Sequence, residues 1–425
     1  MIPEAATTTP APLTLWVVPV ADLGGVARHV LDVARVGLPG LRLAVLCPEG
    51  PLAERLREQG AAVFTGDVGP DAGLAASVRT LRTAVRTLRP AAVHTHLAYA
   101  DLAAFTALGT GRALRRAGAP ALLSTEHGIA PDDGLYNRAA AARVKNAAHR
   151  ARLRGTDLVI AVAQSTADVL RRKWGAGAPL TVVRNGVDVP AVRAAAAGQR
   201  HAPGEGLRIL SLSRLAPEKN LDRLIAALPA LLERDPGTRL TLAGTGPLAA
   251  ALRAQAEDLG VADAVDLPGF VEPWGTMAEH DVLVQLSAWE NLSYTLLDAA
   301  AAGLPAVATD VGGNGEILPP ERLVRETTPA AIADAVMRAA ADGPGEGAVL
   351  RHQGLSPAVV AAGVLYPVFG LLLSPVIAAA AMALSSVLVV SDDSSLVGSV
   401  SVSGIGVVGR RRNTWLRSVT GGSAS

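Results

Sequence analysis

Cysteine is the scarcest reactive residue in this chain: Cys47 is the only one among 425 residues. A single cysteine excludes an internal disulfide and any metal site built from several cysteines. Cys47 lies in the apolar stretch LRLAVLC, which predicts a buried thiol. Neither sign of charge is in excess, because 39 Lys and Arg residues stand against 38 Asp and Glu residues, so a nucleic-acid partner is not expected.

Two further signals are missing from the chain. No GxxxxGK[ST] motif occurs, which argues against a P-loop NTPase. The N-terminal stretch MIPEAATTTPAP has an acid and no basic residue before the apolar LTLWVVPV. This argues against a signal peptide and for a first β-strand, and it predicts a cytoplasmic catalytic body.

Short apolar runs alternate with longer segments of helical period from Leu13 onward. Continuous apolar strands separated by helices predict parallel sheets covered on both faces. A stretch rich in Ala, Gly and Pro, 189–206, is interpreted as a linker. The fold class is therefore α/β, with Rossmann-like, doubly wound domains at 1–188 and 207–345 facing a ligand-binding cleft. The expected strands are 13–20, 41–47, 61–66, 91–96, 121–126, 156–163 and 180–186, then 207–215, 239–246, 264–270, 281–287 and 305–313.

The C-terminal part differs in composition. No charged side chain occurs between Arg351 and Asp392, and this run exceeds the roughly 20 apolar residues that cross a bilayer. After a linker at 346–356 we expect a hydrophobic membrane segment at 357–390 and a disordered tail at 391–425. Such a segment would tether the catalytic domains to the inner face of the cell membrane. A buried core helix is the alternative interpretation.

Cations and glycines occupy positions where a predicted strand leads into a helix. Arg214 ends a strand of the second domain and Lys219 precedes an amphipathic helix, an arrangement that suits a diphosphate. Gly24 and Gly25 lie at the equivalent place in the first domain, where a ligand can approach the backbone and the helix N-terminus favours an anion. The alternatives are a solvated turn for the cations and a tight turn for the glycines, which lack the full GxGxxG pattern.

Three histidines end predicted strands of the first domain. His94 and His96 are expected on opposite faces of the sheet, and so poorly placed to bind one metal ion together. One of them could face the cleft as a polar contact or proton acceptor, and His127 is a second cleft candidate. A purely structural role is the alternative for each.

Two acids stand eight residues apart in SAWENLSYTLLDAAAAGLP. On one helix Glu290 and Asp298 would lie about 12 Å apart along the axis. That is too far for a glycosidase pair, which needs roughly 5–9.5 Å, but it suits the two ends of one extended polar ligand. Ser293 is a predicted N-cap, which places Glu290 in the preceding loop. On spacing alone, two unrelated acids are the plainer interpretation.

Taken in order, the second-domain stretches resemble the family 4 glycosyltransferases of the GT-B fold, over about 13–342. The motifs are S-R-L-x-x-E-K-N, L-A-G-T-G-P-L, V-x-L-P-G-F and E-N-L-x5-D-A-A-A-A-G-L-P. The resemblance implies transfer of a sugar from a nucleotide-diphosphate-sugar with retention of anomeric configuration. No D-x-D motif occurs, so a metal-clamped site of the GT-A type is unsupported, and neither a metal nor another cofactor is expected.

The resemblance also implies roles for matching positions. Asp298 stands where the family usually has Glu, one methylene longer. In the second domain the matching residues would bind the diphosphate (Arg214, Lys219), the donor sugar (Glu290, with the amides of Asn291 and Leu292), the ribose (Asp298) and the nucleobase (Gly269, Phe270). In the first domain they would lie near the phosphates (Gly24, Gly25) and the anomeric carbon (His96).

The acceptor is open: a glycan, a lipid-linked molecule or a small molecule, in a setting such as cell-envelope or exopolysaccharide synthesis. His127 and Arg138 are candidates on the acceptor side. The basic helix predicted at 137–155 could approach an anionic lipid-linked acceptor or a membrane surface. A solvated helix face is the alternative.

The C-terminal part departs from the family, which ends in helices that cross back onto the first domain. Residues 363–390 instead resemble the last transmembrane hairpin of heavy-metal P-type ATPases, including Met382, Ser385 and Ser386. The D-K-T-G phosphorylation site of those pumps is missing, so ion pumping is not expected. Two other functions stay open: a nucleotide-sugar epimerase on the same fold, and an inactive membrane-tethered fusion protein.

Overall fold

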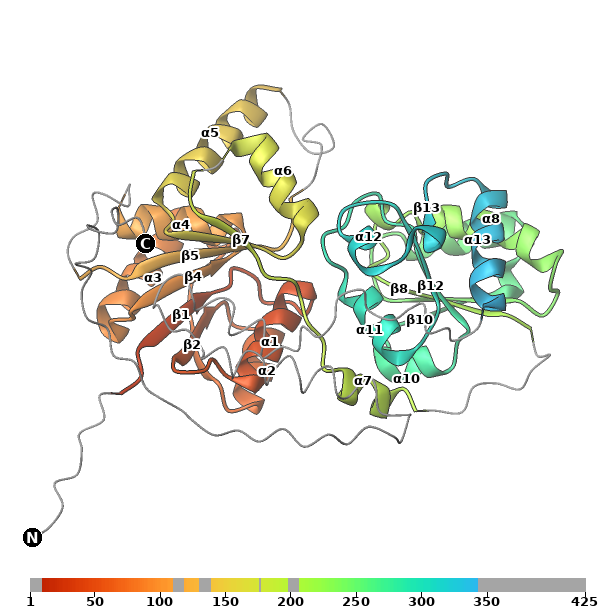
Figure 1. Ribbon diagram of the computed structural model, residues 1–425, viewed down its shortest axis with the longest axis horizontal. Helices are drawn as coiled ribbons and strands as arrows, with labels where there is room; N and C mark the ends of the chain where they lie inside the picture. Colours follow the sequence, from red (N-terminus) through yellow and green to blue (C-terminus); the bar gives the residue numbers. More distant parts are fainter. Residues whose placement is uncertain (1–9, 110–117, 130–138, 176, 198–205, 343–425) are drawn as a thin grey trace, which may run out of the picture.

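The protein consists of two α/β domains that lie side by side, as a computed structural model shows (Figure 1). The structure describes residues 10–109, 118–129, 139–175, 177–197 and 206–342. The hydrophobic segment expected at 357–390 and the tail expected at 391–425 lie outside these residues. Within the described part of the chain, no helix is both long and apolar enough to span a membrane.

The first domain is built on a parallel sheet with the strand order β3-β2-β1-β4-β5-β6-β7. Each expected strand of this half is present, and the sheet is covered on both faces by helices (Figure 1). The strands are β1 (Leu13–Val17), β2 (Arg42–Cys47), β3 (Ala62–Thr65), β4 (Ala92–His96), β5 (Ala121–Glu126), β6 (Leu158–Ala161) and β7 (Leu180–Val182). The helices are α1 (Gly25–Val36), α2 (Pro51–Glu58), α3 (Leu74–Leu88), α4 (Ala98–Leu108), α5 (Ala139–Gly155) and α6 (Gln164–Trp174).

The second domain repeats the plan with the strand order β10-β9-β8-β11-β12-β13, again parallel. The short strand β13 is the one strand here that the sequence pattern did not predict. The strands are β8 (Arg208–Leu212), β9 (Arg239–Ala243), β10 (Val265–Gly269), β11 (Val282–Gln285), β12 (Ala306–Thr309) and β13 (Leu323–Val324). The helices are α8 (Leu221–Leu232), α9 (Ala249–Asp258), α10 (Pro273–Ala278), α11 (Tyr294–Ala302), α12 (Asn314–Ile317) and α13 (Pro329–Ala341).

Both cores follow from the apolar strands. Strand β1 lies between β2 and β4, and its residues from Thr14 to Val17 are all buried. Helices cover both faces of a central parallel strand, so the side chains on both faces are buried. This is why these strands are nearly continuous apolar runs. Cys47 ends β2 inside the first core, as its apolar stretch predicted, and burial raises the pKa of its thiol to about 11.

Part of the stretch interpreted as a linker is helical. Helix α7 (Val189–Ala195) begins after Asp188, whose side chain accepts a hydrogen bond from Ala191 N, and it packs on α10 and α11. Its Val192 belongs to an apolar cluster that also contains Val162 and Ala163 of the first domain. The chain therefore enters the second domain along the interface between the two domains.

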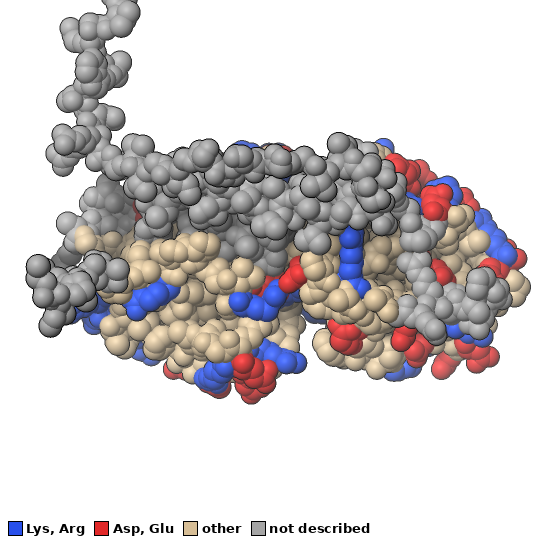
Figure 2. Space-filling view, turned by 60° about the horizontal axis from the view of Figure 1, so that its bottom comes forward, with Lys and Arg blue, Asp and Glu red and all other residues tan. Residues whose placement is uncertain are grey.

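The carboxyl ends of the two sheets face each other across this interface. Glu316 of α12 accepts hydrogen bonds from the backbone N–H groups of Gln164 (3.1 Å) and Ser165 (2.9 Å), at the start of α6 in the other domain. An acid at a helix N-terminus is favourable because the N–H groups and the helix dipole are both positive there. Charged side chains of both signs are interspersed on the face drawn in Figure 2.

Candidate active site

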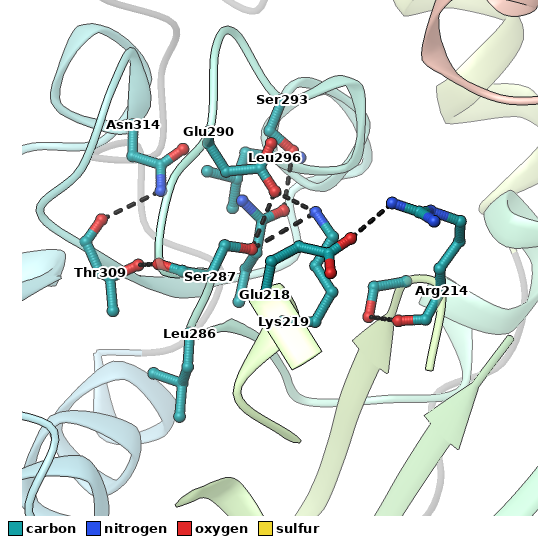
Figure 3. Close-up of polar contacts among 12 residues, drawn as sticks. Arg214, Glu218, Lys219, Leu286, Ser287, Glu290, Ser293, Leu296, Thr309 and Asn314 are labelled. Carbon is teal, nitrogen blue, oxygen red and sulfur yellow. Dashed lines mark hydrogen bonds and ion pairs between the residues drawn. The ribbon is translucent and has the colours of Figure 1, made fainter. Parts of the chain in front are cut away.

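The predicted diphosphate-binding cations lie where β8 leads into α8. Arg214 follows the strand, its side chain is 75% exposed, and it forms an ion pair with Glu218 (2.5 Å). Lys219 ends a short 3-10 turn, Pro217–Lys219, and forms an ion pair with Glu290 (Figure 3). The structure thus places Lys219 and Glu290 in direct contact, although 71 residues separate them.

The loop that carries Glu290 is held by hydrogen bonds on both sides. Ser287 Oγ donates to Glu290 Oε1 (2.8 Å), and Thr309 Oγ1 donates to the Ser287 carbonyl (2.6 Å) (Figure 3). Gly312, at φ +55°, lies so close that a Cβ there would stand 1.8 Å from the Glu290 carbonyl oxygen. Glycine is therefore required at this crossing, and the carboxylate of Glu290 is held in a fixed position.

Helix α11 begins at the predicted N-cap. Ser293 Oγ accepts a hydrogen bond from Leu296 N (3.3 Å) and donates one to Gln285 Oε1 (2.7 Å). Glu290 accordingly lies in the preceding loop. The Leu292 carbonyl accepts from Asn185 Nδ2 (3.0 Å), and Asn291 Oδ1 accepts from Thr166 Oγ1 (3.2 Å), so this loop contacts the first domain.

Asp298 lies on α11 and contacts the first domain. Its carboxylate forms two hydrogen bonds with the guanidinium of Arg28, which comes from α1. Arg28 lies over the rings of Tyr294 (5.0 Å) and Trp274 (5.6 Å). Burial raises the pKa of Asp298 above its ordinary value, and the hydrogen bonds from Arg28 act in the opposite direction. The carboxylate expected to bind ribose is thus an interdomain contact in this structure.

Gly24 and Gly25 of the first domain lie beside open space. Gly24 is the N-cap of α1 with φ −155°, an extended backbone that any residue adopts. A Cβ at Gly24 would meet nothing within 4 Å, and one at Gly25 would meet only Tyr294 Cδ2 at 3.8 Å. No side chain caps this helix N-terminus. Neither turn geometry nor packing therefore explains Gly24, which favours the ligand-binding interpretation over the tight turn.

The residues expected at the nucleobase end β10. Gly269 has φ +84°, in the left-handed region that favours glycine, and its carbonyl accepts from Gly244 N (2.7 Å). Phe270 follows with 79% of its surface exposed. An aromatic ring this exposed offers a stacking surface for a planar ligand.

The histidine prediction was wrong about the faces. His94 and His96 point to the same side of the sheet, with ring centroids 4.6 Å apart, because side chains two residues apart in a strand share a face. His96 Nδ1 lies 2.8 Å from His127 Nε2, and the ring of His29 lies 5.0 Å from that of His127. Four imidazoles therefore form one cluster beneath the cleft.

Burial keeps these imidazoles neutral at pH 7. It lowers the pKa of His29 to about 4 and that of His94 to about 3. The pKa values of His96 and His127 are also well below the ordinary value, through burial and the neighbouring imidazoles. A neutral imidazole can donate and accept hydrogen bonds without adding charge, and of these four rings His127 is the one that is partly exposed.

A pocket of about 400 Å³ opens beside Glu290, between α6 and the loop that precedes α11. Its lining includes Ser165, Arg172 and Trp289. Ser165 Oγ and Trp289 Nε1 are buried without a hydrogen-bond partner among the described atoms. Buried polar atoms are normally paired, so these two are suited to a ligand that carries hydroxyl groups.

The basic helix is only partly a solvated face. Arg143, Lys145, Arg150 and Arg154 are exposed on α5. Arg152 is not, and the expectation that it faces solvent or an anionic surface was wrong: it is 1% exposed and pairs with Asp101 and Glu126. Burial removes a guanidinium from water at a high free-energy cost, which two carboxylates offset here. Arg138 lies outside the described residues.

Several site residues were missed at the sequence level. His29 and Arg28 both follow the Gly24-Gly25 turn, so the run GGVARH was the available signal. Ser165 and Trp289 gave none, because their role depends on which loops meet across the domain interface.

Comparison with known proteins identifies the family of both domains and a structure with the same fold. Residues 23–190 match the family described as "Glycosyltransferase Family 4", and residues 193–351 match "Glycosyl transferases group 1". Anabaena HepE, solved in complex with UDP-glucose, shares the fold with a TM-score of 0.65 at 19% identity, over 89% of this chain and 100% of that one.

Curated relatives match over shorter regions. A GDP-mannose-dependent alpha-(1-6)-phosphatidylinositol monomannoside mannosyltransferase of Mycobacterium tuberculosis is 35% identical over 179 residues, 38% of this chain and 46% of that protein. A glycogen synthase of the same species is 36% identical over 168 residues, 39% of this chain and 40% of that protein. The chain thus spans less than half the length of these two relatives. It carries the two domains of a GT-B glycosyltransferase, a family 4 domain followed by a group 1 domain.

Proposed function

We propose that the protein is a retaining, metal-independent glycosyltransferase that uses a nucleotide-diphosphate-hexose as donor. The observation that carries the proposal is the Lys219–Glu290 ion pair, fixed by Ser287 at the carboxyl end of the second sheet. The uncapped N-terminus of α1 and the open space at Gly24 supply a place for phosphate on the first domain.

The chemistry follows from where charge develops. Breaking the bond between the anomeric carbon and the diphosphate oxygen leaves negative charge on the diphosphate. Preorganised cations at that position stabilise the transition state more than the ground state. Lys219 is the positioned cation, while the exposed Arg214 can close onto the phosphates by side-chain rotation. Glu290 would then exchange part of its contact with Lys219 for the hydroxyl groups of the donor sugar.

The donor nucleotide is proposed from the comparisons. HepE was solved with UDP-glucose, and the mycobacterial mannosyltransferase is GDP-mannose-dependent by name. We therefore propose a UDP- or GDP-hexose, with the base near Phe270. The pocket beside Glu290, with its unpaired Ser165 Oγ and Trp289 Nε1, is proposed to receive the acceptor hydroxyl groups.

Donor turnover by three variants tests the assignment. The donor is first selected from UDP- and GDP-hexoses by thermal shift, and its hydrolysis or transfer is then followed by nucleotide release. Glu290→Ala and Lys219→Ala should each lower kcat/KM by about 10²–10³-fold, as for loss of one transition-state contact. The matched control is Arg55→Ala, which removes an exposed ion pair with Glu58 away from the cleft. Unchanged turnover in both site variants would refute the proposed site.

The product identifies the reaction. NMR of the product should show a glycoside, or free hexose without acceptor, whose first-formed anomer matches the donor. An epimerised nucleotide-sugar in the absence of acceptor would instead show epimerase activity and overturn the proposal.

A further inference from the structure

Three histidines from three different elements converge beneath the cleft. His29 comes from α1, His96 ends β4, and His127 follows β5. One ring nitrogen from each can be chosen so that all three lie within 4.8 Å of one another. The carboxyl ends of adjacent strands in a parallel sheet bring β4 and β5 together here. The ring of His29 lies 5.6 Å from that of His96 and 5.0 Å from that of His127, measured between centroids.

Two of these rings have a nitrogen without a partner. His29 is 3% exposed and His96 is fully buried, yet Nε2 of each forms no hydrogen bond within the described part of the chain. Buried polar groups are paired in the great majority of cases, and an exception calls for a specific explanation such as an ion. Two such exceptions within one cluster of imidazoles point to a ligand that accepts electron pairs from nitrogen.

The surroundings hold the rings in place. Trp16 stacks on His29 with ring centroids 5.7 Å apart and contacts His96 at 4.5 Å. Nδ1 of His29 lies 3.3 Å from the hydroxyl oxygen of Tyr294. A histidine that binds a metal ion usually donates its other N–H to such an oxygen, which fixes the ring and raises its basicity.

We propose that His29, His96 and His127 bind one divalent transition-metal ion of the Zn²⁺, Co²⁺ or Ni²⁺ class. Three imidazoles and one open position form a common tetrahedral site, whereas Mg²⁺ and Ca²⁺ prefer oxygen ligands. A tetrahedral ion needs nitrogen atoms about 3.4 Å apart, from metal–nitrogen bonds of about 2.05 Å. The three nitrogen atoms lie within 4.8 Å of one another and must therefore move closer together when the ion binds, and the unpaired Nε2 atoms of His29 and His96 are available for it.

The proposed metal ligands come from the first domain, whereas Lys219 and Arg214 come from the second. The test of the proposal is metal binding, so it does not depend on the transferase activity. A bound ion would tie α1 to the ends of β4 and β5, and so stabilise the wall of the cleft that carries Gly24.

Cobalt titration tests the site through a readout independent of activity. The full-length protein, freed of metal with a chelator, is titrated with Co²⁺ and then with Zn²⁺. We expect one equivalent of Co²⁺ to give visible absorption bands typical of a tetrahedral site, and Zn²⁺ to abolish them by displacement. His29→Gln and His127→Gln should each weaken Co²⁺ binding by more than the roughly 10–100-fold that changes outside the ligand shell cause.

Two further variants make the test decisive. His280→Gln is the matched control, because His280 is a buried histidine of the second domain with both ring nitrogens bonded, and it should bind Co²⁺ as wild type does. His127→Cys keeps a ligand and should add a near-ultraviolet thiolate-to-cobalt band. This band is attributable by comparison with wild type, which contains the one natural cysteine, Cys47, but not the introduced thiol.

Three results would overturn the proposal: tetrahedral bands that persist in His29→Gln and His127→Gln, bands that disappear in His280→Gln, or no new band in His127→Cys. If a glutamine variant fails to fold, His127→Cys decides by itself, because it retains a metal ligand.

Discussion

The two domains place their charged and neutral polar side chains differently around the cleft. The second domain presents charges at the surface of the cleft, where Lys219 pairs with Glu290 and Arg214 with Glu218. The first domain keeps its imidazoles largely buried beneath the cleft and forms a fully buried ion pair as well, in which Arg152 contacts Asp101 and Glu126. Glu126 immediately precedes His127, so this buried network lies next to the histidine cluster.

This difference separates stability from catalysis. Lys219 and Glu290 are partly exposed, at 18% and 15%, so water can take the place of a lost partner, and their charges can act on a ligand that develops charge. Charges buried in a pair are costly to disrupt, because removing one partner leaves the other without water or counter-charge. A change in the first-domain network should therefore affect folding, and a change in the second-domain pair should affect turnover.

The largest expected effect is that of Arg152→Met. It leaves Asp101 and Glu126 buried without a cation and should lower the free energy of unfolding by about 3–5 kcal/mol. Urea denaturation followed by circular dichroism measures it. Arg55→Ala, which breaks an exposed pair, should change the stability by less than about 0.5 kcal/mol. A loss for Arg152→Met as small as that of the control would contradict the contrast between buried and exposed charges.

The second-largest effect is the opposite one, in which a change at Lys219 affects turnover and leaves stability nearly unchanged. Lys219→Met should reduce kcat by about 10²–10³-fold, while KM for the donor and the melting temperature change far less. The cause is the loss of a cation that acts on the leaving diphosphate, with an apolar stem of similar length left in place. Steady-state kinetics of donor turnover measures the split. A variant that loses stability but not kcat would show that the ion pair is structural.

A third, smaller effect is the pH dependence of stability that comes from His280, a buried histidine of the second domain. His280 has both ring nitrogens bonded, to the Thr276 carbonyl (2.7 Å) and the Thr241 hydroxyl (3.0 Å). Burial lowers the pKa of His280 below its ordinary value of 6.5. Below pH 6.5 this histidine therefore binds more protons in the unfolded state than in the native state. As the pH falls, His280 by itself lowers the free energy of unfolding by at most about 1.4 kcal/mol per pH unit.

The corresponding measurement compares pH profiles of stability. His280→Gln should flatten the fall between pH 6.5 and 5 relative to wild type, whereas Arg55→Ala should leave the slope unchanged. An identical slope in wild type and His280→Gln would mean that this histidine keeps its ordinary pKa in the native state.

The smallest expected effect on folding belongs to Gly24→Ala. A Cβ at this position meets no atom within 4 Å and the backbone is extended, so the melting temperature should scarcely change. The methyl group should nevertheless obstruct the donor phosphates and weaken donor binding about tenfold, or ~1.4 kcal/mol. Calorimetric titration with the nucleoside diphosphate measures it. Unaltered affinity would mean that the phosphates do not approach this turn.

The candidate site residues that could be proposed from the sequence are those whose positions depend on local chain geometry. Ser293 was identifiable as an N-cap, and Arg214, Lys219, Gly24 and Gly25 were identifiable because each lies where a strand leads into a helix. The prediction that His94 and His96 lie on opposite faces of the sheet was wrong, because side chains two residues apart in a strand share a face. Arg28, Ser165 and Trp289 were not identifiable, since each acquires its role from a segment more than 100 residues away.

The sequence by itself determined the two parallel sheets, the order of the elements and the strand ends at which ligand-binding groups gather. These depend on apolar periodicity and turn residues, which act over a few neighbours along the chain. Only the tertiary structure decided that Glu290 contacts Lys219, that Asp298 contacts Arg28, and that three histidines share one cluster. Those pairings depend on how two sheets and their loops meet, and long-range packing leaves no trace in local spacing.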